Sequence, residues 1–395
     1  ASPSARVSRI LLDIDYANLV RRKPFLDGIL LRQADIDLPG PDGEPVLRIE
    51  DLDARITFEP GRIRLRGASF RVHDIACEVS GIARNAGSAA ARPAGQMIAW
   101  PPGLADRLRT EMDRLVFQPD TARLRIEFDI DLSVPGSLQI PKATLHTGRV
   151  QRGRLALERL QIDGTFRDGM VELHHLSAAD PTGTLEGTGL WNVRAGAGDL
   201  QVRSSLALQN LLREFLPARP LSEVHFYDPP ELQASIRVDP AREPRLLATG
   251  RVSARRFGLR SVLFDGFRAL FAFDGRRLLL EDAQLLHRSG SLNARLLSAP
   301  GDFRLQAGST LNPQALGPLL GPKAMEELGR WTFDQPPRLT VEVRGPAPKP
   351  EAVEATGRLA LGGGSYRGVS FLGGDTDLRI RGNAFHYENF TVRRP

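Results

Sequence analysis

The sequence predicts a mainly β fold: an elongated, open antiparallel sheet built from tandem modules of several strands, with a few short helices between the modules. Three observations predict it. Apolar and polar residues alternate along most of the 395 residues, a tetrapeptide recurs together with its surroundings, and helical spacing of apolar residues is confined to a few short stretches. The alternation is decisive for the class, because successive side chains of a strand point to opposite faces of the sheet.

The alternating runs define the expected strands. Leu124, Ile126 and Phe128, for example, are separated from one another by charged residues. This period of two is typical of a strand that has one apolar and one solvated face. Turn signals such as Asp274-Gly275 separate the runs, and an Asp-Gly pair between two alternating runs is a strong hairpin signal. Sequential antiparallel strands are therefore expected.

A tetrapeptide occurs three times in the last three quarters of the chain, as Thr147-Gly148-Arg149-Val150, Thr249-Gly250-Arg251-Val252 and Thr356-Gly357-Arg358-Leu359. Its surroundings recur in the same order, with a period of about 105 residues. Such a period is too long for a small helical or leucine-rich repeat, so each unit must be a module of several strands. The function of such an array is expected on a surface that is repeated along one axis.

Helical spacing of apolar residues occurs in three short stretches at matching places. They span residues 104–117, 208–217 and 313–330, and each leads into a connector that contains Phe and Pro. One module is therefore expected to consist of a short helix, this connector and about five or more strands.

The repeats also predict the domain organisation. Residues 84–102 are rich in Ala, Gly and Pro, which is typical of a flexible loop or linker. We expect an N-terminal β block at 1–83, the linker at 84–102, and β modules at 103–205, 206–308 and 309–395, the last of them truncated.

Composition and charge exclude several classes of protein. Cys77 is the only cysteine, which excludes a disulfide framework and a Cys-rich metal site within one chain. The 53 basic residues are interspersed with 47 acidic ones. A nucleic-acid-binding protein concentrates its basic residues on one face or in a run. No nucleic-acid partner is therefore expected.

Side chains that support catalysis or metal binding are few. Glu172 and His174 share one face of an expected strand while His175 points to the other, and no further Cys or His cluster lies near them in the sequence to complete a metal site. The run Gly362-Gly363-Gly364 lacks the Lys and Ser/Thr of a phosphate-binding loop. No Ser/His/Asp set can be assembled by spacing. The sequence predicts no enzyme activity, no cofactor and no metal site.

No stretch of the chain approaches the roughly 18 apolar residues of a membrane-spanning helix. No signal peptide precedes the first expected strand, and the chain begins at Ala1 without Met. We expect it to be part of a longer protein.

Segments near the N-terminus combine aliphatic residues with Asp, Arg and short turns. They span residues 10–21, 23–29, 34–39, 52–58 and 60–63. In this pattern the chain resembles the start of AsmA-like proteins of the Gram-negative envelope. Its later modules resemble the repeating β-groove units of the same superfamily of bridge-like lipid-transfer proteins.

The resemblance implies a long, open antiparallel sheet that is curled into a groove with an apolar inner face. It implies an inner-membrane anchor helix outside this chain and the transport of phospholipid between the inner and outer membranes, in outer membrane biogenesis. The expected localisation is the periplasm and cell envelope. The expected partners are phospholipid and membrane, with protein partners unidentified.

The residues lead to a groove without the resemblance. If each strand has one apolar face, three short helices cannot cover roughly twenty strands, so either two sheets cover each other or the sheet curls around an apolar ligand. Acyl chains need only apolar walls. The candidate groove-lining residues are Leu124, Ile126, Phe128, Leu155, Leu157, Val171, Leu173, Ile236, Val238, Phe267, Phe271, Phe273, Leu278, Leu280, Val341, Leu378 and Ile380. The alternative is a structural or adhesive β-repeat of the cell envelope, a sandwich array without lipid cargo.

Overall fold

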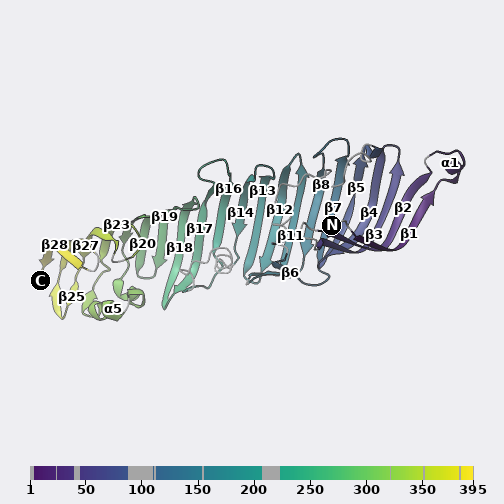
Figure 1. Ribbon diagram of the computed structural model, residues 1–395. Helices are drawn as coiled ribbons and strands as arrows, with labels where there is room; N and C mark the ends of the chain where they lie inside the picture. The colour runs from purple at the N-terminus through teal and green to yellow at the C-terminus, as the bar shows by residue number, and fades with distance from the viewer. Residues whose placement is uncertain are drawn as a thin grey trace. The chain divides into compact units, whose positions relative to one another are not determined.

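The computed structural model describes residues 4–23, 25–39, 45–87, 110, 113–153, 155–206, 223–320, 322–349, 352–381 and 384–394. The chain forms two compact units, residues 1–200 and 201–395, and each is described by itself. Both are mainly β, with an open, mostly antiparallel sheet whose strands follow largely in chain order (Figure 1).

The main sheet of the first unit begins with the hairpin of β1 and β2, whose connection contains the short helix α1. Asp15 caps this helix by accepting a hydrogen bond from the backbone N–H of Asn18, at 3.1 Å. The elements are β1 (Ser4–Ile14), α1 (Tyr16–Val20), β2 (Leu26–Pro39), β3 (Pro45–Glu59), β4 (Arg62–Val72), β5 (Ile75–Arg84), β7 (Ala122–Asp131), β8 (Gln139–Thr147), β11 (Arg159–Arg167), β12 (Met170–Asp180) and β13 (Gly183–Asn192), followed by β14 (Ala197–Ser204).

One pairing in this sheet is parallel. Strands β5 and β7 run in the same direction, with Ile75 opposite Ala122 and Cys77 opposite Leu124. Strand β7 therefore begins beside the first residue of β5 and not beside its last. The expectation of sequential antiparallel strands is therefore wrong at this place, because a hairpin turn cannot join two parallel neighbours.

The second unit contains an antiparallel sheet and its accompanying helices. Its main-sheet strands are β15 (Val224–Phe226), β16 (Glu231–Val238), β17 (Leu246–Leu259), β18 (Val262–Phe273), β19 (Leu278–His287), β20 (Gly290–Ala299), β21 (Asp302–Ser309), β23 (Arg338–Gly345), β24 (Glu354–Leu361), β27 (Gly373–Arg381) and β28 (Ala384–Arg393). The helices η4 (Pro313–Leu316), α4 (Gly317–Leu320) and α5 (Pro322–Leu328) lie between β21 and β22 (Trp331–Phe333).

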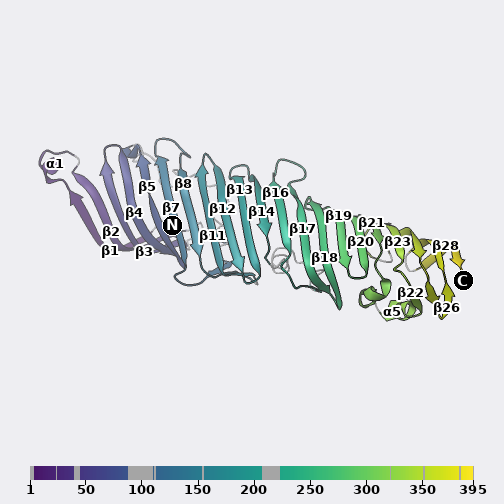
Figure 2. The same cartoon turned by 180° about the vertical axis from the view of Figure 1, so that it is seen from behind.

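The predicted connectors form a recurring structure. Each contains a three-residue strand that ends in Phe: β6 (Leu115–Phe117), β15 and β22. Strand β6 pairs with the hairpin of β9 (Val150–Arg152) and β10 (Leu155–Leu157), β15 pairs with the end of β17, and β22 pairs with the hairpin of β25 (Gly364–Tyr366) and β26 (Val369–Phe371). In the second unit β22, β26 and α5 lie together at one edge of the sheet (Figure 2).

The residue after each connector strand makes the same backbone hydrogen bond. Its N–H donates to the carbonyl oxygen just before the partner segment: Gln118 to Arg149, Tyr227 to Arg256 and Asp334 to Gly363, at 2.8, 3.0 and 2.8 Å. The connectors that recur in the sequence therefore have the same local structure. The division of the chain into modules that begin at residues 103, 206 and 309 remains a prediction.

Glycine of the recurring tetrapeptide has a packing role in the second unit. A Cβ at Gly250 would overlap the carbonyl oxygen of Gln233 on β16, and one at Gly357 would overlap that of Thr340 on β23. Both glycines therefore permit close approach of the preceding strand. Gly148 differs, because it lies between β8 and β9 and faces the side chain of Thr121.

The helix predictions have three outcomes. Residues 313–330 are helical from Pro313 to Leu328, apart from residue 321, which lies outside the described residues. Residues 208–217, like most of 104–117, also lie outside them. At 115–117 a helix is wrong: Leu115 and Phe117 pair with β9, and burial of Phe117 against the main sheet outweighs the weak helical spacing.

The predicted mainly β class, the open antiparallel sheet and the few short helices are confirmed in both units. Neither unit closes its sheet or curls it strongly. The strong curl expected from the sequence is absent, since alternation fixes which face is apolar and not how far the strands bend.

Candidate functional site

Strand register places apolar residues of successive strands of the second unit in rows on one face of the sheet, because directly opposite residues point to the same side. We call this the apolar face of the second unit. Its central row contains Gly250, Phe271, Leu280, Leu296, Leu305, Val343, Ala355 and Ile380. Neighbouring rows contain Ile236, Ala248, Phe273 and Leu278 on one side, and Val252, Ala269, Ala283, Ala294, Ala307, Val341, Gly357 and Leu378 on the other.

The first unit has an apolar face of the same construction. One row contains Ile10, Leu31, Ala54, Ala68, Val79, Ile126, Ala143, Gly164 and Leu173. A second contains Phe70, Cys77, Leu124, Leu145, Ile162 and Leu176. The apolar face continues across the parallel pair of β5 and β7. Cys77 lies opposite Leu124 and Val79 lies opposite Ile126, so the apolar side chains of both strands point to the same side of the sheet.

The structure brings most of the sequence-predicted lining residues onto these two faces. Leu124, Ile126, Phe128, Val171 and Leu173 lie on the apolar face of the first unit, and the predicted residues from Ile236 to Ile380 lie on that of the second. Leu155 and Leu157 do not. They belong to the small sheet of β6, β9 and β10, where Leu155 is buried.

Sequence reasoning missed several residues of the central row. Leu296 and Leu305 lie between Leu280 and Val343, and both are half-buried. The alternation of Phe303, Leu305 and Ala307 with polar residues was a usable signal for Leu305. At Leu296 the adjacent Leu297 obscures the period, so the sequence alone leaves the face of this pair undecided.

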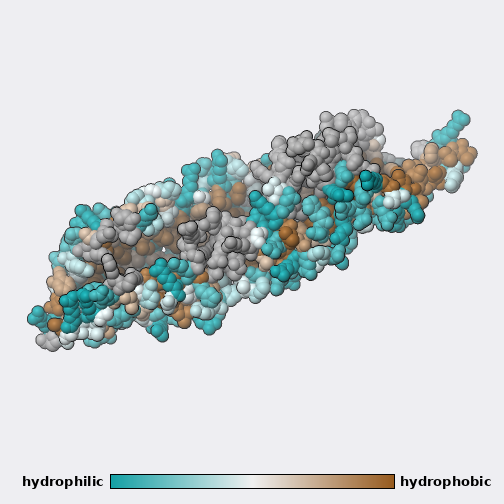
Figure 3. All heavy atoms as spheres, turned by 60° about the horizontal axis from the view of Figure 1, so that its bottom comes forward, coloured by the Kyte–Doolittle hydropathy of each residue, from teal (hydrophilic) through white to brown (hydrophobic). Residues whose placement is uncertain are grey.

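The side chains of the central row are half-buried rather than buried. Phe271, Leu280, Leu296, Leu305 and Val343 all have this intermediate exposure. The other sheet of the described residues in this unit consists of β22, β25 and β26, which have three residues each and are too few to cover a row that crosses eight strands. Figure 3 shows hydrophobic residues within a hollow of the surface over the second unit, and more of them around β1 in the first.

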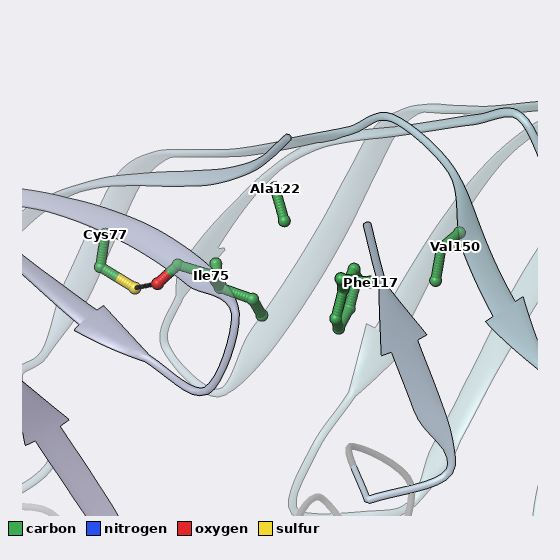
Figure 4. Close-up of a cluster of buried hydrophobic side chains, with 5 residues drawn as sticks. All are labelled: Ile75, Cys77, Phe117, Ala122 and Val150. Carbon is green, nitrogen blue, oxygen red and sulfur yellow. Dashed lines mark hydrogen bonds between the residues drawn. The ribbon is translucent and has the colours of Figure 1, made fainter. Parts of the chain in front are cut away.

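Each apolar face is covered at one end. In the first unit the small sheet contributes Phe117 and Val150, which are buried together with Ile75, Cys77 and Ala122 of the main sheet (Figure 4). In the second unit the cover consists of Leu316 of η4 and Leu319 of α4, next to Val224 and Phe226 of the main-sheet strand β15. They pack against Ala254, Phe257, Val262 and Phe264. The connector hairpins and helices thus form a wall beside each half-buried face.

Polar groups near the covered end are satisfied. The hydroxyl of Thr376, which is 2 % exposed, donates to the carbonyl oxygen of Glu388 at 2.9 Å, and Ser309 Oγ accepts from the backbone N–H of Leu311 at 3.1 Å. The Thr376 hydroxyl is thus paired despite its burial, and Ser309 Oγ is used as an acceptor.

The opposite face of the second unit is polar and carries ion pairs between adjacent strands. Arg295 and Glu281 lie 2.9 Å apart, and Arg358 and Asp375 lie 3.1 Å apart. On the same face the Arg344 guanidinium donates to Glu342 and holds the pKa of that carboxyl below its usual value. These exposed pairs favour a solvated surface and add little to stability.

A hollow of about 1350 Å³ lies over this polar face of the second unit. Its lining includes Arg251, Arg268, Glu281, Arg295 and Glu342, together with Ala269 and Ala294. The hollow is open to solvent and is lined by both basic and acidic side chains. It is a trough between charged rows and not the apolar groove that the sequence predicts.

The described residues contain no group of three or more His, Cys, Asp or Glu side chains arranged to hold a metal ion. His174 Nδ1 lies 3.6 Å from Glu172 Oε1, and a β-bulge places His175 opposite Asp163.

Burial raises the pKa of the Cys77 thiol to about 11. Among the described helices none is long and apolar enough to span a membrane.

Comparison of the chain with models of known protein families, with curated proteins and with solved structures gave no match in any of the three.

Proposed function

We propose that the chain binds phospholipid acyl chains on its apolar faces and conducts them along those faces, as part of a lipid conduit of the Gram-negative cell envelope. The observation that carries the proposal is the set of half-buried apolar rows, which cross many strands, whereas the only other sheets of the described residues have three short strands each. Apolar surface left in water costs about 25 cal/mol per Å². An extended surface of this kind normally marks an interaction site.

Acyl chains fit the chemistry of the rows. The central row offers aliphatic and aromatic carbon and almost no polar side-chain atom, so an occupant must forgo hydrogen bonds there. A hydrocarbon chain meets that condition. Because strands are about 4.8 Å apart, a chain that lies across them meets an equivalent apolar contact at each step. Because these contacts are equivalent, the acyl chain can move along the row and is not held at one position.

The groove of this proposal has the apolar face as its floor and the connector hairpins and helices as its wall. A strongly curled sheet is not required, since the wall already covers one end of the strands. The polar face, with its exposed ion pairs, remains in water. The headgroup of a bound phospholipid is placed toward the end of the strands that the described connector residues leave uncovered, where it can be hydrated.

The proposed setting is the periplasm between the inner and outer membranes, with an inner-membrane anchor outside this chain and phospholipid and membrane as partners. Support comes from the resemblance to AsmA-like proteins and from the apolar faces. The proposed activity is transport without chemical conversion, so no enzyme activity, metal or cofactor is invoked. A nucleic-acid partner is not proposed, because the polar face mixes both signs of charge.

Two experiments test the proposal. The protein purified from a Gram-negative host should yield phospholipid by mass spectrometry of its organic extract, above the level of a soluble protein purified in the same way. An extract without lipid above that level favours the structural or adhesive β-repeat instead.

The second experiment uses two positions of β18. Phe271 lies in the central apolar row and Arg268 on the opposite face. Phe271→Glu should retain the fold but lose fluorescent-lipid transfer, because a carboxylate among acyl chains is desolvated without a partner. Arg268→Glu should transfer lipid normally. Equal transfer by both variants contradicts the proposal, and global unfolding of Phe271→Glu shows that the position is closed core.

A further inference from the structure

The connection between β1 and β2 presents an apolar and basic tip that no part of the proposed function uses. Helix α1 has no buried residue. Apolar side chains of the connection are exposed, to 73 % at Tyr16, 41 % at Leu19, 83 % at Val20 and 41 % at Phe25. Figure 3 shows hydrophobic residues at this end of the first unit. These apolar side chains add little to the stability of the fold, because they bury little surface within the described part of the unit.

Basic side chains lie at the outer part of the tip, and carboxylates lie at its base. Arg21, Arg22 and Lys23 follow the helix directly, are exposed, and form no ion pair among the described residues. The carboxylates of the same segment lie at its base: Asp13 and Asp27 belong to β1 and β2, and Asp15 caps the helix. The outer part of the connection is therefore basic and apolar together, although the segment as a whole is neutral.

Several backbone N–H groups of the tip are paired within it. The N–H of Leu19 donates to Asp15 O at 2.9 Å, and that of Lys23 donates to Asn18 O at 2.9 Å. At the base of the tip the N–H of Asp15 donates to Phe25 O at 2.8 Å. Backbone groups that are paired in this way lose less hydration when the tip approaches the hydrocarbon boundary of a bilayer.

We propose that this tip inserts shallowly into the surface of an anionic lipid bilayer. Tyr16 and Phe25 have the amphipathic or aromatic character that the membrane interface favours. Val20 and Leu19 supply aliphatic contact, while the long Arg and Lys side chains reach the anionic headgroups beside it. A bilayer fits better than a protein, because a specific protein interface needs about 1000 Å² of buried surface and one short helix with its flanking loop offers much less.

The inference goes beyond the proposed function, because it concerns a membrane-surface contact outside the apolar faces. Sedimentation of the full chain with vesicles tests it. The protein should bind vesicles of mixed phosphatidylglycerol and phosphatidylcholine more strongly than vesicles of phosphatidylcholine alone. Changing Arg21, Arg22 and Lys23 together to Gln should weaken binding to the anionic vesicles by about a hundredfold, since each basic residue contributes about fivefold.

Val20→Asp should weaken binding by about tenfold or more, because it removes an apolar contact and adds a charge of the wrong sign. The matched control is Val369→Asp, at a position of β26 that is 65 % exposed and distant in sequence. Val20→Asp should still yield phospholipid in its organic extract, as the unchanged protein does, which separates this inference from the proposed function. Equal binding to both kinds of vesicle, or no effect of Val20→Asp, overturns the inference.

A spectroscopic measurement gives a second readout. Cys77 is 4 % exposed with a raised thiol pKa, so a cysteine introduced by Val20→Cys can be labelled selectively with an environment-sensitive dye. Its emission should shift to the blue on anionic vesicles, whereas dye at Val369→Cys should not respond. If Val20→Asp instead changes the sedimentation of the protein without vesicles, the tip contacts a second copy of the chain and the bilayer assignment is wrong.

Discussion

Two phenylalanines of β18 distinguish the closed core from the open apolar face. Phe264 is 2 % exposed and packs in the cluster covered by η4 and α4, while Phe271 is half-buried in the central row. Replacing each with Ala removes the same atoms from the same strand. The difference in cost therefore reports on what lies over each side chain.

The expected costs follow from burial. Phe264→Ala leaves a cavity beneath the connector wall, for which about 3–5 kcal/mol is typical. Phe271→Ala loses roughly 70 Å² of buried apolar surface and leaves no enclosed cavity. At about 25 cal/mol per Å² this loss costs about 2 kcal/mol. The two variants should differ by about 2 kcal/mol.

Urea unfolding of lipid-free protein measures this difference, because both positions lie in the second unit and report on the same transition. Lipid must be removed first, since a ligand of the folded state raises its apparent stability. Equal losses for Phe264→Ala and Phe271→Ala would show that the central row is enclosed as tightly as the core. The open-face interpretation would then fail.

Three further predictions concern single sites. Gly357→Ala should destabilise the second unit by about 1–3 kcal/mol in urea, because its Cβ overlaps a backbone oxygen of β23, while Gly308→Ala, with open space around it, should be nearly neutral. Hydrogen bonds from Arg256 lower the pKa of Asp228, so this contribution to stability is present above the ordinary Asp pKa of about 4 and is lost as pH falls through the lower folded value. The urea midpoint of Asp228→Asn should accordingly fall less steeply below pH 4 than that of the unchanged protein; parallel curves would contradict this. Cys77 should resist iodoacetamide at neutral pH in the folded protein and react in urea, and equal rates would show that its burial is wrong.

The period of two was sufficient to predict the apolar faces. Phe267, Phe271 and Phe273 lie on one face because β18 has no bulge between them on its pairing with β17. The same signal failed at Leu155 and Leu157, since two apolar residues separated by one position occur equally in a three-residue strand of a small sheet. A pattern this short carries no information about which sheet a strand joins.

Other features were outside the reach of local patterns. The parallel pairing of β5 and β7 depends on the path of the segment between them, and strand Leu115–Phe117 depends on a partner some 35 residues away in the chain. Curvature also has no counterpart in the alternation, because bending depends on bulges and twist along each strand. The exposed apolar residues of α1 were visible in the sequence, but their exposure required the structure.

The central claim is that acyl chains occupy the apolar face and not the opposite one. Its most direct test is a photo-crosslinking amino acid placed at Phe271, on the apolar face, or at the adjacent Leu270, which is 41 % exposed on the polar face. After irradiation of protein purified from a Gram-negative host, mass spectrometry should find phospholipid adducts at position 271 and none at position 270. Adducts at neither position, or equally at both, would contradict the account.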